Sequence, residues 1–319
     1  MGYLALERLK KYKMRWIYLV ATVIVMMIIS IYQYSWSIFA KGIQSEFKWE
    51  LPAIQVAFTI FAYAATFIQP FSGYFADRFG PRLIAIIGAI LTSIGFLATS
   101  TITSLPQLYL YYGLGSLGVG MMYGLSAALA IKWFPDRRGL ATGITTFGFG
   151  AGTSLFNPVF INWINSLGVR ATFLYTGIIM IVILFPLSFI YIYPEFLPQL
   201  RSSSTGGSSG SSEKKVEEKK ETKPTVDTTN FKWYEMLRTY QWWLIYLSFT
   251  MIAAIALLFG ANLSFIAKER KIPTELYAIA SAAFPLTNGF SRILGGYISD
   301  YIGRQNTATL FYALSGVLM

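Results

Sequence analysis

The chain has 319 residues, of which 55% are hydrophobic, 17% aromatic and only 13% charged, and its net charge is +11. This composition excludes an ordinary soluble domain. The chain contains no Cys and no His, which excludes disulfide bonds, thiol chemistry and imidazole ligands or proton carriers, so we expect no metal and no cofactor.

Nine apolar runs follow one another along the chain, and most are long enough to cross roughly 30 Å of hydrocarbon as a helix. They cover residues 16–40, 52–75, 83–104, 107–131, 140–164, 171–194, 241–266, 275–298 and 305–319. The first run is too long, and too poor in small residues at a cleavage site, to be a removable signal peptide. We therefore expect an all-α protein embedded in a lipid bilayer.

Basic residues are distributed unevenly between the two sides of these predicted spans. Nineteen Lys and Arg fall on the side of the N-terminus and six on the other side. This bias follows the positive-inside rule, so we expect a multi-pass protein of the plasma membrane with a cytoplasmic N-terminus. The basic turn at 268–271 runs against the bias. Because the positive charge is explained by the loops of a membrane protein, we expect no nucleic-acid partner.

Residues 195–240 differ in composition from the rest of the chain. A Ser- and Gly-rich run at 202–212 is followed by a stretch rich in Glu and Lys. Such segments are typical of flexible, solvated coil. The sequence therefore predicts an N-terminal six-helix bundle at 1–194, a cytoplasmic flexible linker at 195–240, and the first three helices of a truncated second bundle at 241–319. A regulatory tail is the alternative for the linker.

One charged motif occurs twice, each time between two apolar runs. The first copy, GYFADRFGPR, begins at Gly73, and the second, GYISDYIGR, begins at Gly296. Both read as tight turns between membrane helices in an internal repeat. This repeat resembles the signature loop of the major facilitator superfamily, whose halves repeat one another. The resemblance implies the major facilitator fold, with nine spans present of an expected twelve.

Other segments make the resemblance more specific. They are RWIYLV at 15–20, QYSW at 33–36, AIQVAFT at 53–59, KWFPDRRGLA at 132–141 and NGFSR at 288–292. Together they resemble the oxalate:formate antiporter family, which is related to the monocarboxylate transporters. The resemblance implies a secondary active transporter of small carboxylates by alternating access, with anion exchange of oxalate or formate as the favoured reaction. We expect it to be a monomer.

Two other functions stay open. The first is a monocarboxylate transporter for lactate- or pyruvate-like substrates, and the second is a membrane sensor that binds a ligand without moving it. An enzyme is not expected, because the sequence shows no paired carboxylates, His cluster or nucleophile–base set. The sequence also lacks a Gly-rich phosphate loop, which argues against an ATPase.

Arg292 is the one charged residue deep within a predicted span. Inserting a central Arg costs about 2.5–3.5 kcal/mol, so a partner must offset the charge. No carboxylate lies near the centre of a predicted span, and a guanidinium can bind a substrate carboxylate through two parallel hydrogen bonds. The resemblance places the substrate-binding arginine of the family here. The alternative is a structural Arg that faces water. Asn288 stands where proton-coupled relatives often have an acid, which favours exchange or uniport.

The resemblance adds five residues to the predicted substrate site. They are Gln33, Tyr34, Gln55, Tyr123 and Phe149. Aromatic walls exclude water and strengthen polar contacts with a small anion. The alternative for each residue is a structural contact between helices. The family often has Tyr where Phe149 stands, so the missing hydroxyl bears on substrate choice.

Charged residues at the turns form a predicted gate. They are Asp77, Arg78, Arg138 and Asp300. The resemblance implies that this cluster latches the cytoplasmic side, and we predict Arg138 as the partner of Asp77. Gly80 would permit the turn after Asp77. Glycine-rich runs at 113–124 and 143–152 predict either tight helix packing or a gating hinge.

Overall fold

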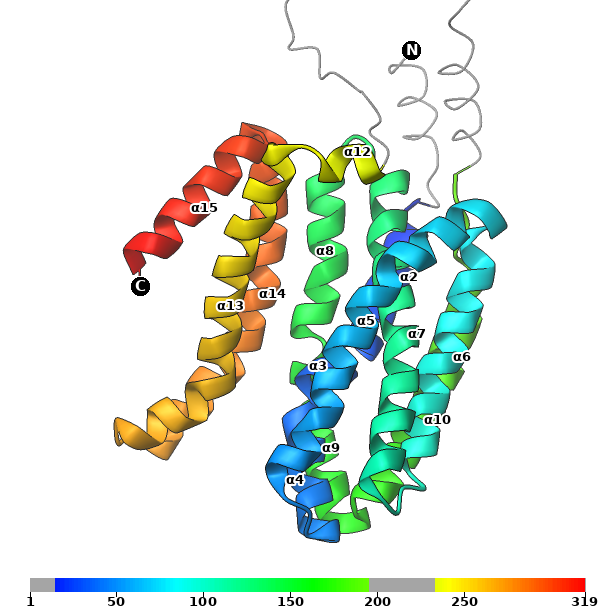
Figure 1. Cartoon of the computed structure of the whole chain (residues 1–319), viewed down its shortest axis with the longest axis vertical. Coiled ribbons are helices and arrows are strands. Elements are labelled where there is room, and N and C mark those ends of the chain that lie inside the picture. The colour runs from blue at the N-terminus through cyan, green and yellow to red at the C-terminus, as the bar shows by residue number, and fades with distance from the viewer. Residues whose placement is uncertain (1–14, 195–232, 319) are drawn as a thin grey trace, which may run out of the picture. The chain divides into compact units, whose positions relative to one another are not determined.

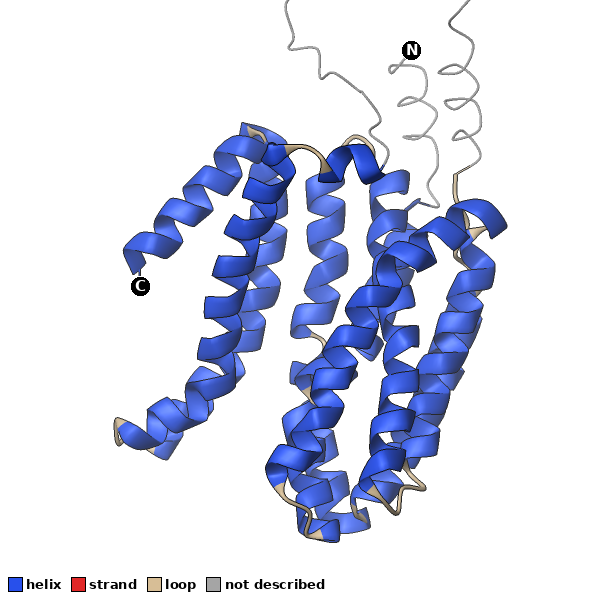
Figure 2. Ribbon diagram, in the orientation of Figure 1, coloured by secondary structure: helices blue, strands red, loops and turns tan. Residues whose placement is uncertain are grey.

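The computed structural model describes residues 15–194 and 233–318, which form helices joined by short turns and contain no strand (Figures 1 and 2). Contacts divide the chain into two compact units. The first joins Met1–Phe196 with Ala278–Leu310, and the second joins Leu197–Tyr277 with Phe311–Met319. The predicted linker falls mostly on residues 195–232, which lie outside the described residues. The predicted domain boundaries therefore stay a prediction.

Most helices fall on the predicted apolar runs, whereas one short helix, at Trp233–Leu237, lies within the predicted linker. Those of residues 15–194 are α2 (Arg15–Ile29), α3 (Ile31–Tyr34), α4 (Trp36–Phe47), α5 (Leu51–Phe79), α6 (Pro81–Thr99), α7 (Leu105–Trp133), α8 (Arg138–Ala151), α9 (Thr153–Leu167) and α10 (Val169–Ser188). The others are α12 (Trp233–Leu237), α13 (Tyr240–Glu269), α14 (Thr274–Ile302) and α15 (Arg304–Leu318).

Five helical segments in the described part of the chain are long and apolar enough to cross a membrane. They are Arg15–Tyr34, Leu51–Phe79, Pro81–Thr99, Leu105–Trp133 and Val169–Ser188. The predicted all-α fold is confirmed, and these segments fit a protein that spans a membrane. The count of nine spans stays a prediction.

Two predicted spans are divided into shorter helices, which the apolar pattern does not predict. The run at 16–40 contains α2, α3 and α4, and the run at 140–164 contains α8 and α9. The backbone keeps helical torsions at the Ser30 and Gly152 junctions and bends at Ser35, where φ is −95° and ψ is −3°. At the α2–α3 junction the Ser30 hydroxyl donates to the Met27 carbonyl at 2.7 Å. Small and hydroxyl-bearing residues are common where helices bend, because they add little bulk and can bond backbone groups.

The repeated motif forms the same turn in both copies. Gly80 separates α5 from α6 with φ of 92°, and Gly303 separates α14 from α15 with φ of 89°. Glycine adopts this left-handed side of the backbone map without the steric cost that a Cβ would bring. The structure thus confirms that Gly80 permits the turn, and the second copy turns at the matching glycine.

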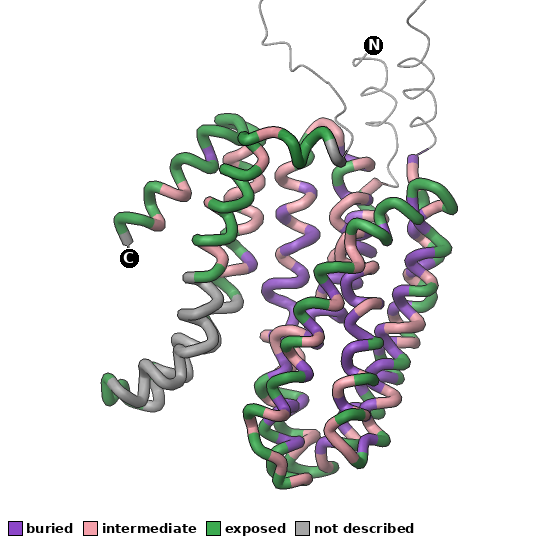
Figure 3. The backbone as a smooth tube through the Cα atoms, viewed as in Figure 1, coloured by how far each residue is buried: buried purple, intermediate pink, exposed green. Residues whose placement is uncertain are grey.

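Helix α7 packs against α5 and α6, and buried residues are frequent along it (Figure 3). A Cβ added at Gly118 would collide with the backbone of Gly88 and Thr92 on α6. One added at Gly120 would collide with the Ala65 carbonyl on α5. These glycines of the 113–124 run therefore serve tight packing.

We expect Gly118→Ala to lower the free energy of unfolding by about 1–3 kcal/mol, because the added methyl group overpacks a contact made by backbone. Gly124→Ala is the matched control on the same helix. Its added Cβ would meet nothing closer than 3.7 Å. The control should gain about 0.5–1 kcal/mol from the higher helix propensity of Ala. Thermal unfolding in detergent measures both variants, and equal effects would contradict the packing role.

Candidate functional site

Arg292 lies half-buried on α14, within the first compact unit. Glycines bring α14 close to α8. A Cβ at Gly143 would collide with the Arg292 carbonyl, and a Cβ at Gly150 would lie 2.9 Å from the Cα of Gly289. Small residues allow such close approach of helix backbones. The glycines of α8 therefore allow the backbone of α14 at Arg292 to lie close to α8.

The Arg292 guanidinium has one neutral partner on its own helix. Its Nε donates to Asn288 Oδ1 at 3.2 Å, one turn earlier. It also lies close enough to the Tyr34 phenol to interact with it. No acidic side chain lies within 4 Å of Arg292 in the part of the chain that the structure describes. Asn288 thus orients the guanidinium while its positive charge remains available to an anion.

An aromatic cluster adjoins Tyr34. The ring of Tyr34 meets that of Phe149 edge to face at 5.6 Å, and Tyr123 meets Phe149 in the same way at 5.0 Å. Phe149 is buried, while the two tyrosines are half-buried. The structure therefore brings four of the predicted site residues together, from α3, α7, α8 and α14. Edge-to-face contacts fix the three rings relative to one another, and the Tyr34 ring among them lies close to the guanidinium.

The two predicted glutamines are not part of this cluster. Gln55 on α5 is exposed, and its Oε1 accepts a hydrogen bond from the Trp36 indole at 2.8 Å. Gln33 is half-buried on α3. Neither residue contacts Arg292 among the described side chains. Their substrate role therefore stays a prediction, while the structure shows a helix-to-helix contact for Gln55.

At the α5–α6 turn, Asp77 pairs with Lys132 rather than with the expected Arg138. Lys132 Nζ lies 2.9 Å from the Asp77 carboxylate and 3.3 Å from the centre of the Tyr193 ring. Burial and the nearby Asp77 carboxylate raise the pKa of the Tyr193 phenol, which stays protonated at neutral pH. The prediction that Arg138 pairs with Asp77 was wrong, because Lys132, in the last turn of α7, forms the ion pair instead.

The other gate residues differ in their contacts. Arg78 is exposed, with its guanidinium 3.4 Å from the Tyr74 hydroxyl and 5.6 Å from the centre of the Phe79 ring. Arg138 is the first residue of α8 and makes no ion pair among the described residues. A gating role for both therefore stays a prediction.

Asp300 lies at the position of the second motif that matches Asp77, and it binds a helix end. Its two carboxylate oxygens accept hydrogen bonds from the backbone N–H groups of Gly139 and Leu140, at 2.9 and 2.8 Å. These groups are among the four at the start of α8 that lack a partner within the helix, where the helix dipole favours a negative charge. Asp300 thus joins α14 to the N-terminus of α8. A pocket of about 320 Å³ adjoins this contact.

The α7–α8 turn is also fixed by α2. Arg15 lies 3.3 Å from the Asp136 carboxylate, and its guanidinium lies 4.8 Å from the centre of the Phe134 ring. The rings of Tyr18 and Trp133 stack at 4.2 Å. The segments 15–20 and 132–141, which carry much of the family resemblance, therefore contact each other. Sequence reasoning missed this pair of segments as a unit, although both were singled out.

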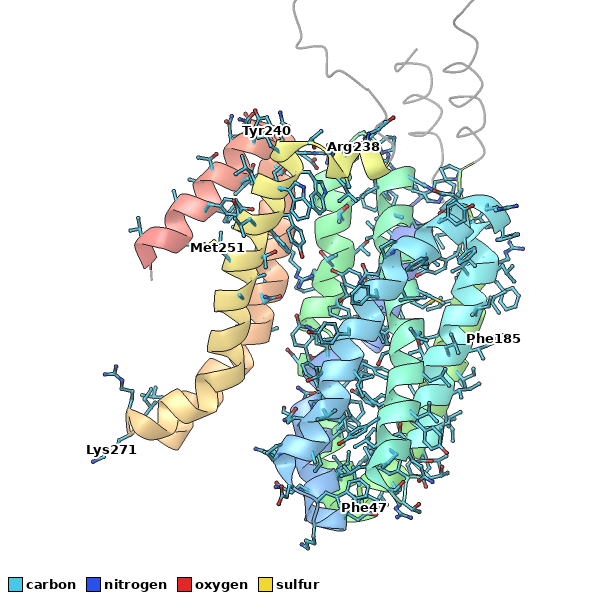
Figure 4. All side chains as sticks on the ribbon, viewed as in Figure 1. Phe47, Phe185, Arg238, Tyr240, Met251 and Lys271 are labelled. Carbon is cyan, nitrogen blue, oxygen red and sulfur yellow. The ribbon has the colours of Figure 1, made fainter. Side chains whose placement is uncertain are left out.

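The opposite end of the first unit has a similar carboxylate contact. Glu46 accepts a hydrogen bond from the Val169 N–H at 3.2 Å and pairs with Arg170 at 3.1 Å. The Arg170 guanidinium lies 4.8 Å from the centre of the ring of Phe47, which ends α4 (Figure 4). This contact joins α4 to the start of α10.

The repeated glycine turns, the long apolar helices and the half-buried arginine are typical of a multi-helix membrane transport protein. The sequence matches the family described as the Major Facilitator Superfamily over residues 9–319. The chain belongs to this family of secondary transporters. The predicted resemblance to the superfamily is thereby confirmed.

Within this family the chain is a relative of the oxalate:formate antiporters. It is 33% identical over 305 residues to "Oxalate:formate antiporter" of Oxalobacter formigenes, an alignment that covers 96% of this chain and 68% of the relative. It is 29% identical over 243 residues to "Monocarboxylate transporter 10" of Mus musculus, covering 74% of this chain and 44% of that protein.

A solved structure has the same fold. It is the proton:xylose symporter XylE bound to 6-bromo-6-deoxy-D-glucose, with a TM-score of 0.50 and 18% identity. The match covers 60% of this chain and 47% of XylE. At this identity the likeness shows the fold alone.

Proposed function

We propose that the protein exchanges small carboxylates across the membrane by alternating access, with Arg292 as the residue that binds the anion. The observation that carries the proposal is the half-buried guanidinium without an acidic partner among the described residues. Asn288 orients it, and Tyr34 lies beside it. A guanidinium offers a carboxylate two parallel hydrogen bonds, and a site shielded by aromatic rings strengthens them.

The favoured substrates are oxalate and formate, because a relative at 33% identity is named an oxalate:formate antiporter. The phenol of Tyr34 and that of Tyr123 can donate hydrogen bonds to the oxygens of a bound anion. Phe149 lies between the two tyrosines and offers no hydroxyl of its own. A small anion held by one guanidinium and two phenols fits the residues that the structure brings together.

Counterflow in proteoliposomes tests this proposal. Vesicles loaded with unlabelled oxalate should take up radiolabelled oxalate or formate saturably, and vesicles without internal carboxylate should not. Uptake of lactate or pyruvate in place of oxalate would favour the monocarboxylate alternative, which the mouse relative supports. Ligand binding without uptake would indicate a sensor. Absence of both binding and uptake for every small carboxylate would overturn the proposal.

We place the protein in the plasma membrane, with the N-terminus and the 195–240 linker in the cytoplasm. The gate then lies on the cytoplasmic side, since Asp77 and Asp300 lie near the ends of α5 and α14, on the same side of the predicted spans as the N-terminus. Lys132 and the start of α8 bind these two carboxylates. Alternating access would require the Asp300 contact to open and close.

Topology can be measured with single cysteines, because the native chain has none. A Cys introduced at Ser208 should resist a membrane-impermeant maleimide added outside intact cells and react after the membrane is permeabilised. The matched control is a Cys at Lys48, which the same orientation places outside and which should react in intact cells. Labelling of position 208 from outside would contradict the proposed orientation.

A further inference from the structure

The break between α3 and α4 follows directly after Tyr34. Ser35 separates the two helices with φ of −95° and ψ of −3°. Ser35 and the next residue, Trp36, are both buried. Carbonyl groups in the last turn of a helix lack a partner along that helix. In a buried place each such group needs a donor from elsewhere.

One donor comes from α7. The Tyr112 hydroxyl donates to the carbonyl of Tyr32, within the last turn of α3, at 2.6 Å. Both side chains are completely buried, and their rings lie 4.8 Å apart. The Tyr32 hydroxyl in turn donates to the Thr92 carbonyl on α6 at 2.7 Å. The end of α3 is therefore fixed to α7 and α6 through buried hydroxyl groups.

Two other helices contact the break itself. The Ser35 hydroxyl donates to Asn157 Oδ1 on α9 at 2.6 Å. The Trp36 indole N–H donates to Gln55 Oε1 on α5 at 2.8 Å. Three separate helices thus each supply one polar side chain to the segment from Tyr32 to Trp36. We call Tyr112, Asn157 and Gln55 the clasp.

We propose that the clasp positions Tyr34 for the carboxylate site by holding the α3–α4 break in one conformation. Tyr34 is the residue next to the break, and its phenol lies beside Arg292 and Phe149. A shift of the break would therefore move the phenol relative to the guanidinium. The clasp residues act through Tyr34 and do not touch the anion themselves. This role rests on the proposed function, and it gives Gln55 a positioning role in place of direct substrate contact.

Tyr112→Phe is the sharpest test, because it removes one hydroxyl and leaves the ring that packs against Tyr32 and Trp36. We expect the dissociation constant for oxalate to rise about five- to tenfold, as for the loss of one buried hydrogen bond. Tyr191→Phe is the matched control. It removes another buried hydroxyl that bonds to α7, through Ser126 and away from the break, and it should leave oxalate affinity unchanged.

A double-mutant cycle separates positioning from general damage. In a Tyr34→Phe background, Tyr112→Phe should cause no further loss of oxalate affinity, because the Tyr34 hydroxyl that the clasp positions is already absent. The same fold-change in both backgrounds would overturn the proposal. An unchanged affinity in Tyr112→Phe alone would also overturn it.

A second measurement needs no ligand. With a Cys at Gln33, in the same short helix as Tyr34, the rate of labelling by a maleimide reports the conformation at the break. The rate should change several-fold in Tyr112→Phe and stay constant in Tyr191→Phe, whereas equal rates in all three proteins would refute the clasp. If the unmodified protein binds no carboxylate, the proposed function fails, and these rates still decide whether the clasp holds the break.

Discussion

Replacing Arg292 with Gln should abolish carboxylate binding while the protein stays folded. The substitution removes a charge that is costly to place inside a membrane. It also breaks no ion pair, because Arg292 forms none among the described residues. Arg292→Lys keeps the charge but loses the planar fork. It should weaken binding by roughly 1.5–3 kcal/mol, the range for hydrogen bonds to charged groups. This corresponds to about a tenfold to hundredfold rise in the dissociation constant.

Titration calorimetry with oxalate measures these changes, and counterflow shows whether transport is lost with binding. Arg170→Gln is a suitable control. It removes another guanidinium, which pairs with Glu46 on the other side of the first unit, and it should leave the oxalate affinity unchanged. Near-normal affinity in Arg292→Gln, with normal expression, would show that Arg292 is structural and that the anion binds elsewhere.

Sequence and structure agree best on the positions of the helices, which the continuous apolar runs determine. The apolar runs predict helices from Arg15 to Leu318 because the bilayer requires continuous apolar segments whose backbone groups bond internally. The positive φ of Gly80 and Gly303 follows equally from local chemistry, since a tight turn between two helices favours a residue without a Cβ.

The breaks within the helices could not be predicted in the same way. Ser35 lies in a run that reads as continuous, and it is not next to a Pro that would mark the bend. The bend at Ser35 is stabilised by donors and acceptors from three other helices, the nearest of them about 20 residues away in the sequence. A pattern read along one helix does not contain those contacts.

In the candidate site, too, some features follow from the sequence and others depend on contacts between helices. The resemblance selected Arg292, Tyr34, Tyr123 and Phe149, and the structure places them together. It also selected Gln55, whose amide oxygen instead binds Trp36. The type of residue was foreseen, but its partner depends on the rotation of α5 against α4. A composition pattern leaves that rotation open, and the same reason explains why Lys132 rather than Arg138 pairs with Asp77.

The second large effect is expected at Asp300. Asp300→Ala removes both oxygens that bind the first N–H groups of α8, at Gly139 and Leu140. Loss of a helix N-cap costs about 0.5–2 kcal/mol, and loss of a negative charge near a helix N-terminus adds about 0.3–1 kcal/mol. Asp300→Asn keeps one acceptor oxygen and loses the charge, so its loss of stability should be smaller.

The same substitutions should loosen α14 from α8, and this can be followed by the labelling rate of a Cys at Arg137, which lines the adjoining pocket. We expect the fastest labelling in Asp300→Ala, a slower rate in Asp300→Asn and the unmodified rate in Asp77→Asn. Asp77 is the internal comparison, because it holds the matching motif position but makes a partly exposed ion pair, which is worth about 0–1 kcal/mol. Equal rates in all these proteins would show that Asp300 caps α8 without closing the gate, because a contact that controls access must change access when it is removed.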